Sequence, residues 1–501
     1  MALRDGSDVD AITGRHRLLS DYLVEEVLDH LDAPTAAFVC EAAVLDRFCA
    51  AQLDEILLRD DSAQMLAALA AAGAAFLVGL DEHRQWYRFH RMVVDLLRAR
   101  LRDDRPARYR ELLARAAEIR ERDGDIDGAL LAVVDIGDRA SAARLVAREA
   151  VQLGFDGRAS VLERRIGLLD QQTFTDHPDA AIARAWLGVT TGDAGLIHRS
   201  LIMATKADHG GPLADGTPSV RVAAALVGSM VGVGGVHDVV RHADVVRDAG
   251  DHLVNPWWGA ATVMKGAALS MLGDLRRARN LLESALPVIE DLPGFHAAAL
   301  AHLALLELGD GDDAAAIRRS TAALAIADSF DLCDVVPMVV VYATAAVIAA
   351  RVGDEQAARK AVGVCENLLD RLGTLAARTA LLGHGLLAWT GAALQDSELR
   401  ARHLVAGDRA GKREPDAVAL SRRLERVRIM PIGGQCRPLT AAELKLLPYL
   451  ATHLSLQRIS EELMIGRETV KSQVTSIYRK LAVSSRAAAV VEAKRVGLLS
   501  D

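Results

Sequence analysis

Basic and hydroxyl side chains follow one face of a predicted helix near the C-terminus. Over residues 467–481, Val470, Val474, Ile477 and Leu481 recur at intervals of four, three and four residues, which predicts one buried face. The opposite face has no large apolar residue and carries Ser472, Thr475, Ser476 and Arg479, with Lys471 on its flank. Such side chains form hydrogen bonds with base edges in the major groove of DNA. The pattern therefore predicts a DNA-reading helix; the alternative is an ordinary solvated face.

The neighbouring residues predict the helices that would hold this segment. A first helix is expected over residues 441–452 and a second over 456–463, with Ser455 as its N-cap. A turn over 464–466 leads to the third helix, and a fourth over 486–496 would pack beside it. This is the order of a helix-turn-helix domain, and the fourth helix is a candidate for dimerisation.

Charge is unevenly distributed along the 501 residues, whose net charge is −8. Residues 428–501 hold 11 basic and 6 acidic side chains, whereas the rest of the chain holds 48 basic and 61 acidic ones. An acidic body with one basic terminal module is typical of proteins that bind nucleic acid through that module. The high hydrophobic content of 51% excludes a disordered chain.

Residues 102–427 show the period of stacked helix hairpins. Glycines, mostly followed by a small polar residue, interrupt the helical pattern every 33–44 residues, at Gly124, Gly157, Gly192, Gly235, Gly273, Gly309, Gly353 and Gly391. In the clearest unit Gly273 should end one helix in the left-handed conformation, Asp274 should start the next, and Ala278 should allow close packing. The segment resembles irregular tetratricopeptide repeats; the alternative is a non-repetitive helical domain with glycine caps.

Residues 14–101 differ from this pattern. They predict a helix over 21–31, a Leu/Ala-rich helix, a hairpin with strands 76–80 and 86–89 around a turn at 81–84, and a helix over 90–101. Helices combined with such a hairpin form a winged-helix arrangement.

Two regions resemble one known family. Residues 21–28 and 86–101 resemble the winged-helix domain of the large MalT-like regulators, the ATP-binding members of the LuxR family. The C-terminal segment resembles the LuxR-type helix-turn-helix at Leu439, Thr440, Glu443, Leu454, Ser455, Ile459, Leu463, Ile465, Thr469, Val470, Lys471, Ile477, Tyr478, Lys480, Leu481, Val483, Ser485, Arg486 and Ala487. In that family a nucleotide-binding domain, a winged helix, a tetratricopeptide-like superhelix and a helix-turn-helix follow one another.

We expect the first of these domains to be missing, because the resemblance covers the chain only from about Gly14. The Gly411–Lys412 pair fails the P-loop pattern at two positions, since Arg413 follows it and Ala406 replaces the first glycine. We therefore expect no nucleotide cofactor and no ATP hydrolysis. The winged helix would be a remnant or would dock a separately encoded partner.

The resemblance also implies roles for single residues. Base-facing positions fall on Lys471, Ser472, Thr475 and Ser476. Phosphate contacts fall on Arg458, Arg467, Thr469, Arg479 and Lys480. The sequence departs from the family at Gly466, where a serine N-cap is usual, and at Gln473, where histidine is common. The second departure bears on which bases would be preferred.

Other chemistry is not supported. No catalytic motif is present, and the calcium-loop-like start at Asp123 has Val134 at the position that needs a glutamate, so we expect neither an enzyme nor a metal site. The five cysteines form no C-x-x-C pair, which fits a reducing cytosol. Residues 1–16 lack a signal-peptide core. The uncharged run 335–350 is too short for a membrane span and predicts a buried helix pair.

The sequence thus predicts a mainly α protein with an N-terminal tail (1–13), a winged-helix domain (14–101), a helical-repeat superhelix (102–427) and a helix-turn-helix domain (428–501). We expect a cytoplasmic transcription regulator that binds double-stranded DNA as a homodimer, with a protein or small-molecule effector in the superhelix. The alternative is an interaction scaffold whose DNA-binding module is masked or serves a partner. Four aromatic residues of the repeats line an effector pocket or belong to the core: Trp257, Trp258, Tyr342 and Trp389.

Overall fold

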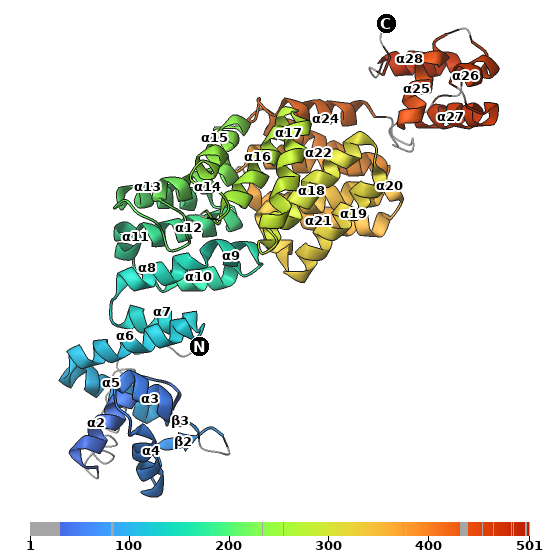
Figure 1. The fold of residues 1–501 in the computed structure, drawn as a ribbon. Helices are drawn as coiled ribbons and strands as arrows, with labels where there is room; N and C mark the ends of the chain where they lie inside the picture. The colour runs from blue at the N-terminus through green and yellow to red at the C-terminus, as the bar shows by residue number, and fades with distance from the viewer. Residues whose placement is uncertain are drawn as a thin grey trace, which may run out of the picture. The chain divides into compact units, whose positions relative to one another are not determined.

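The computed structural model describes residues 31–499, apart from 82–84, 233, 254, 374, 431–438, 453, 464, 482, 484, 496 and 497. The helix expected over residues 21–31 therefore lies outside the described residues, except for its last position. The chain is mainly α-helical and divides into two compact units, Met1–Leu145 and Val146–Asp501. Figure 1 labels their elements.

The first unit contains the expected hairpin. Its elements are α2 (Ala33–Ala42), β1 (Phe48–Cys49), α3 (Ala50–Leu57), α4 (Ser62–Ala71), β2 (Leu77–Gly79), β3 (Trp86–Phe89), α5 (Arg91–Asp104), α6 (Pro106–Arg122) and α7 (Ile126–Asp135). Strands β2 and β3 pair antiparallel, with Leu77 opposite Phe89. The short strand β1 adds to the other edge of β3, which gives the order β1-β3-β2. Two residues are too few to show strand alternation, so the sequence did not predict β1.

The second unit begins with helices that pack against each other as successive hairpins. Its elements are α8 (Arg139–Arg148, across the division), α9 (Ala150–Phe155), α10 (Ala159–Gly167), α11 (Gln171–Asp176), α12 (Pro178–Thr191), α13 (Ala194–Lys206), α14 (Val220–Val231), α15 (Val236–Arg247), α16 (Trp258–Leu272), α17 (Leu275–Ala285), α18 (Pro293–Asp310), α19 (Asp313–Ser329), α20 (Val339–Val352), α21 (Glu355–Leu372), α22 (Ala377–Ala393), α23 (Ser397–Gly411) and α24 (Val418–Ile429). Short 3₁₀ turns cover Leu286–Val288, Leu332–Asp334 and Val336–Met338. This is the expected helical-repeat superhelix.

The second helices of five hairpins start in the same way. Each follows an aspartate whose carboxylate accepts a hydrogen bond from the backbone N–H three residues further on, and these residues are Asp193, Asp274, Asp312, Asp354 and Asp396. An N-cap of this kind satisfies a backbone donor that the helix itself leaves unpaired. The repeated Gly-Asp signal thus marks real helix boundaries.

Six of the eight glycines interrupt the helical pattern, as expected. Five of these adopt the left-handed conformation after a helix, namely Gly124, Gly157, Gly192, Gly273 and Gly353, and Gly235 precedes α15. The expectation was wrong for the other two, because Gly309 lies inside α18, whose C-cap is Gly311. Gly391 lies inside α22, where a Cβ would be 2.6 Å from the backbone nitrogen of Arg400 on α23. It therefore serves close helix packing rather than a turn.

Close approach in the α16–α17 hairpin depends on two small residues. Ala278 is fully buried, as predicted. Facing it, Gly266 has no room for a side chain, since a Cβ would lie 2.8 Å from Cγ of Leu282 and 3.2 Å from the Ala278 carbonyl oxygen.

The superhelix has two hydrophobic clusters, which we call the first and the second core cluster. The first spans residues from Val151 to Leu306, and the second spans residues from Val236 to Leu424. The uncharged run 335–350 belongs to the second and forms a 3₁₀ turn and the single helix α20, not the expected helix pair. Among the described residues, no helix is long and apolar enough to span a membrane.

Two of the four aromatic residues of the repeats, Trp257 and Tyr342, are buried in the core clusters; Trp389 packs against the second cluster, and Trp258 is half-buried. Trp257 is buried and donates its indole N–H to the Asp215 carbonyl oxygen at 3.1 Å, and Tyr342 is buried among the residues of α20. Arginine side chains lie over the rings of Trp258 and Trp389. The alternative of an aromatic effector pocket is therefore not supported.

Candidate DNA-binding interface

Four helices near the C-terminus surround a separate hydrophobic core. They are α25 (Ala441–Leu450), α26 (Leu456–Glu462), α27 (Arg467–Lys480) and α28 (Arg486–Arg495), and each ends within two residues of its predicted end. Val470, Val474, Ile477 and Leu481 are all buried in this core. The apolar period therefore fixed the face of α27 that turns inward.

Three of the four base-facing candidates lie on the outer face of α27. Lys471, Ser472 and Thr475 are exposed. The Ser472 hydroxyl donates to the Thr469 carbonyl oxygen at 3.0 Å, and the Thr475 hydroxyl donates to the Lys471 carbonyl oxygen at 2.9 Å. Each hydroxyl oxygen keeps acceptor capacity toward a base, because only its proton is used within the helix.

The fourth candidate, Ser476, is turned toward the interior. Its hydroxyl forms a hydrogen bond with the carboxylate of Glu443 on α25, and its side chain is only half-exposed. One turn further along, the Lys480 ammonium lies 2.6 Å from the same carboxylate, and both side chains are 5% exposed. This position does not fit the phosphate contact expected of Lys480; the residue joins α27 to α25 instead.

Glu443 has a second role at the start of its own helix. Thr440 is the N-cap of α25, and its hydroxyl accepts a hydrogen bond from the Glu443 backbone N–H, while the Glu443 carboxylate accepts one from the Thr440 N–H. This reciprocal capping box leaves the carboxylate with three kinds of donor, from Thr440, Ser476 and Lys480.

The domain should lose stability in acid because of this carboxylate. Burial alone would raise the pKa of Glu443, but the hydrogen bonds from Lys480, Thr440 and Ser476 hold it below its usual value. A carboxyl whose pKa is lower in the folded state stabilises the fold above its unfolded pKa, about 4.3, and loses that effect as the pH falls through the folded pKa. We expect the protection of the α25 and α27 amides against hydrogen exchange, relative to the intrinsic rate at each pH, to fall below about pH 4.3, and a Glu443→Gln variant to show a flatter profile. Equal pH profiles for both proteins would contradict this assignment.

The phosphate-contact candidates other than Lys480 occupy the rim of this face. Arg467 and Thr469 are exposed in the first turn of α27. Arg458 on α26 is 72% exposed and lies 3.0 Å from Glu461, a surface ion pair of little energetic weight. Arg479 belongs to α27, but its side chain lies outside the described part of the chain. Ser455 caps α26 as predicted, accepting the Arg458 backbone N–H at 3.3 Å.

Arg486 has a role that residue type and spacing did not reveal. Its guanidinium donates to four backbone carbonyl oxygens around the end of α25, those of Tyr449, Leu450, Thr452 and Leu454, at 2.6–2.9 Å. The last carbonyls of a helix have no partner within it, so Arg486 satisfies them and fixes the loop before α26. The only sequence signal was its match to the LuxR-type pattern.

Comparisons with known proteins agree with this geometry. Residues 24–109 match the family described as MalT winged helix domain, and residues 437–493 match the family described as bacterial regulatory proteins, luxR family. The chain is 28% identical over 172 residues to the HTH-type transcriptional regulator MalT of Vibrio parahaemolyticus, and 30% identical over the same length to that of Vibrio cholerae. Each match covers 34% of this chain and 19% of the relative, so the chain spans about a fifth of the curated relatives it matches.

The fold also resembles a solved structure. It is that of a signal transduction ATPase with numerous domains (STAND) from Pyrococcus horikoshii, a protein with a tetratricopeptide repeat sensor. The match has a TM-score of 0.50 and 15% identity, and it covers 81% of this chain and 61% of the other. At this identity the likeness concerns the fold alone. With residues 24–109 similar to the MalT winged-helix domain and residues 437–493 similar to the luxR family, the chain resembles the MalT-like regulators of the LuxR family at both of these segments.

Proposed function

We propose that the protein is a sequence-specific DNA-binding transcription regulator. The observation that carries this proposal is the outer face of α27, where Lys471, Ser472 and Thr475 are exposed opposite a fully buried apolar face. A helix of this kind in a LuxR-family domain enters the major groove, and its polar side chains reach the base edges.

The remaining residues would position the domain on the duplex. We propose that Arg458, Arg467 and Thr469, whose side chains are exposed, contact phosphates, which carry no sequence information but set the register. Lys480 is excluded from this set by its ion pair with Glu443. We further propose that two chains bind two half-sites, with α28 as the candidate dimerisation helix, and that the superhelix senses an effector or a partner. Sensing requires two states that the effector binds unequally.

The test is retention of fragmented genomic DNA by the full-length chain. A Lys471→Ala, Thr475→Ala double variant should lose the discrete fragments that the wild type retains, with affinity reduced by at least roughly thirtyfold, because two base contacts at about 1–3 kcal/mol each are lost. A Lys360→Ala, Thr321→Ala variant, altered at exposed residues of the superhelix, is the matched control. The slope of log affinity against log salt gives the number of phosphates contacted, at about 0.9 per phosphate.

The same assay separates regulation from the scaffold alternative. Residues 428–501 alone are compared with the whole chain. If only the fragment binds DNA, the module is masked in the full chain and the scaffold alternative gains support. If neither binds at any salt concentration, the proposal of a DNA-binding regulator is wrong.

A further inference from the structure

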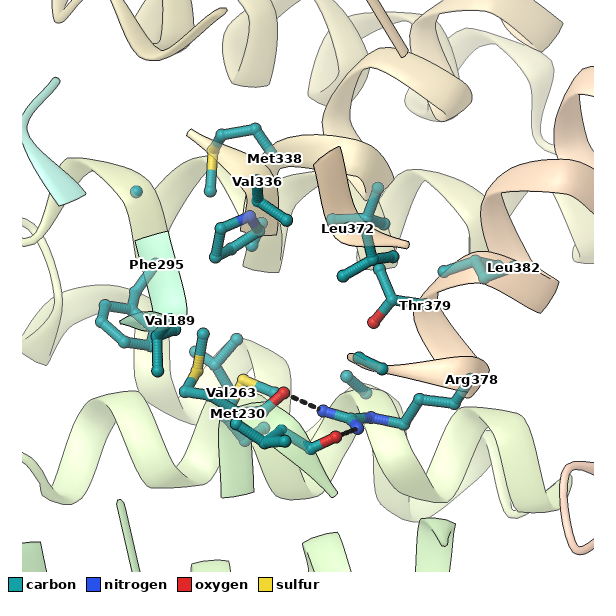
Figure 2. A pocket seen from close by; sticks show the side chains of 18 of the residues that line it. Val189, Met230, Val263, Phe295, Val336, Met338, Leu372, Arg378, Thr379 and Leu382 are labelled. Atoms are coloured by element: carbon teal, nitrogen blue, oxygen red, sulfur yellow. Dashed lines mark hydrogen bonds between the residues drawn. The ribbon is translucent and has the colours of Figure 1, made fainter. Parts of the chain in front are cut away.

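A partly enclosed cavity lies between the two core clusters of the superhelix. Figure 2 shows it from close by. The first cluster contributes Phe155, Val189, Val231, Val263 and Phe295 to its wall, and the second contributes Ala268, Met271, Val336, Met338, Val340, Leu372, Ala376 and Leu382. Its volume is about 70 Å³. We call it the seam cavity, because anything that fills it changes how the two clusters pack together.

The polar edge of the seam cavity is formed by a buried arginine. Arg378, at the start of α22, is 2% exposed and its guanidinium points to the end of α14 (Figure 2). It donates to the carbonyl oxygens of Val231 at 2.6 Å, Ser229 at 3.1 Å and Met230. These bonds join the two sides of the seam, since α14 packs in the first cluster and α22 in the second.

A second polar group in the wall is a histidine. His302 on α18 is 7% exposed and lines the cavity. In ligand sites with mostly apolar walls, a few polar groups of this kind fix the orientation of the ligand. Thr379 adds a hydroxyl to the same wall.

The charges around His302 are mostly positive. Burial, followed by the Arg378 and Arg423 guanidinium groups, lowers the pKa of His302 to about 4, so the ring is neutral at pH 7. Arg378 itself lies near the carboxylate of Glu414, which accepts the Val236 backbone N–H at 2.9 Å and the Arg378 backbone N–H. The polar edge therefore favours an anion, and a ligand anion would raise the pKa of His302.

The apolar wall can change shape. Four methionines line it, Met230, Met264, Met271 and Met338, and methionine is the most adaptable apolar side chain. The cavity of about 70 Å³ is smaller than the roughly 150 Å³ of an apolar cavity that holds benzene in another protein. A ligand larger than a few atoms must therefore move these side chains, and with them the packing between the two clusters.

We propose that the seam cavity binds a small molecule with an apolar body and a single carboxylate, which meets Arg378 and His302. The proposal names the chemical class of the effector. A role of this ligand in regulation rests on the proposed function of the protein as a transcription regulator. The carboxylate competes with the α14 carbonyls for the Arg378 guanidinium, so binding loosens the contact that joins the two clusters. The superhelix thereby acquires the two states that sensing requires.

The test is calorimetric titration of the full chain with hexanoate and octanoate, and with 1-hexanol and 1-octanol. The acids should saturate one site and bind at least tenfold more tightly than the alcohols. An Ala298→Phe variant, which adds a large side chain to the cavity wall from α18 and leaves Arg378 in the sequence, should weaken acid binding at least tenfold. The exposed Ala322→Phe on α19 is the control and should bind like the wild type.

A His302→Phe variant should also weaken acid binding, but not abolish it while Arg378 remains. The proposal is overturned if no acid binds the folded chain at millimolar concentration, if the alcohols bind as tightly as the acids, or if Ala298→Phe leaves acid binding unchanged. Genomic DNA retention is measured on the same preparations without acid. If the wild-type chain retains DNA but binds no acid, only the proposed ligand class is overturned. If the wild-type chain does not retain DNA, the proposed function is contradicted.

Discussion

Replacing Arg378 by methionine should lower the free energy of unfolding of the superhelix by at least about 3 kcal/mol. The guanidinium donates to the carbonyls of Ser229, Met230 and Val231, which belong to the last turn of α14 and have no partner within that helix. Each buried carbonyl left unpaired costs about 1–3 kcal/mol, and a methionine of similar length offers none of them a proton. Glu414 would at the same time lose the cation beside it.

Urea denaturation followed by tryptophan fluorescence measures this effect, because Trp186, Trp257 and Trp389 all lie in the superhelix. Arg318→Met, at an exposed position of α19, is the control and should change stability by less than about 0.5 kcal/mol. An Arg378→Lys variant should recover only part of the loss, since an ammonium cannot reproduce the planar fork. Full recovery by lysine would show that charge, not the carbonyl contacts, stabilises the seam.

The second large effect is expected at the ion pair that joins α25 and α27. In a Lys480→Met variant the Glu443 carboxylate stays buried without its cation, and breaking a buried pair on one side costs about 3–5 kcal/mol. A small domain has little more stability than that, so residues 428–501 should be largely unfolded at 25 °C. Circular dichroism of that segment and hydrogen exchange of α27 in the full chain measure the change.

Two further variants test whether the loss of stability comes from the unpaired Glu443 carboxylate. Lys471→Met removes an exposed lysine from the same helix and should leave the domain folded. A Glu443→Leu, Lys480→Met double variant should recover most of the stability, less the contribution of about 1 kcal/mol from the capping box. If Lys480→Met is as stable as Lys471→Met, the ion pair with Glu443 contributes little to stability, and the phosphate contact expected from the sequence becomes the better assignment.

Local signals predicted the helix-turn-helix well. The caps Thr440 and Ser455 and the apolar period of α27 depend on residues three or four positions apart, and such relations are visible in one sequence. Lys480 shows the limit, because the resemblance to the LuxR-type pattern implied a phosphate contact for it. Only the fold brings Glu443, 37 residues earlier in the chain, to within hydrogen-bond distance of it.

In the superhelix, too, local signals predicted the helix boundaries but not the contacts between distant helices. Aspartate N-caps and left-handed glycines identified the hairpins, yet Gly309 and Gly311 offered two equivalent stops and the helix continues to the second. The sequence predicted a turn at Gly391. In the structure this position lies inside a helix, and it needs glycine because the backbone of another helix packs against it. The seam cavity, Arg378 and His302 depend on contacts between helices far apart in the sequence, and no local pattern contains them.

The contacts of Arg378 and Glu414 also bear on how the chain folds during synthesis. Arrays of repeats in which each unit touches only its neighbours can fold from one end as they emerge. Here the Val236 backbone N–H, in the first turn of α15, donates to Glu414, which lies 178 residues later in the chain. The last carbonyl oxygens of α14 accept hydrogen bonds from Arg378, which lies about 147–149 residues later. At about 5–20 residues per second, the ribosome adds the missing carboxylate roughly 10–35 s after Val236. Until then the middle hairpins lack the partners that close their helix ends, so the superhelix must complete its folding late, as one cooperative body rather than one repeat at a time.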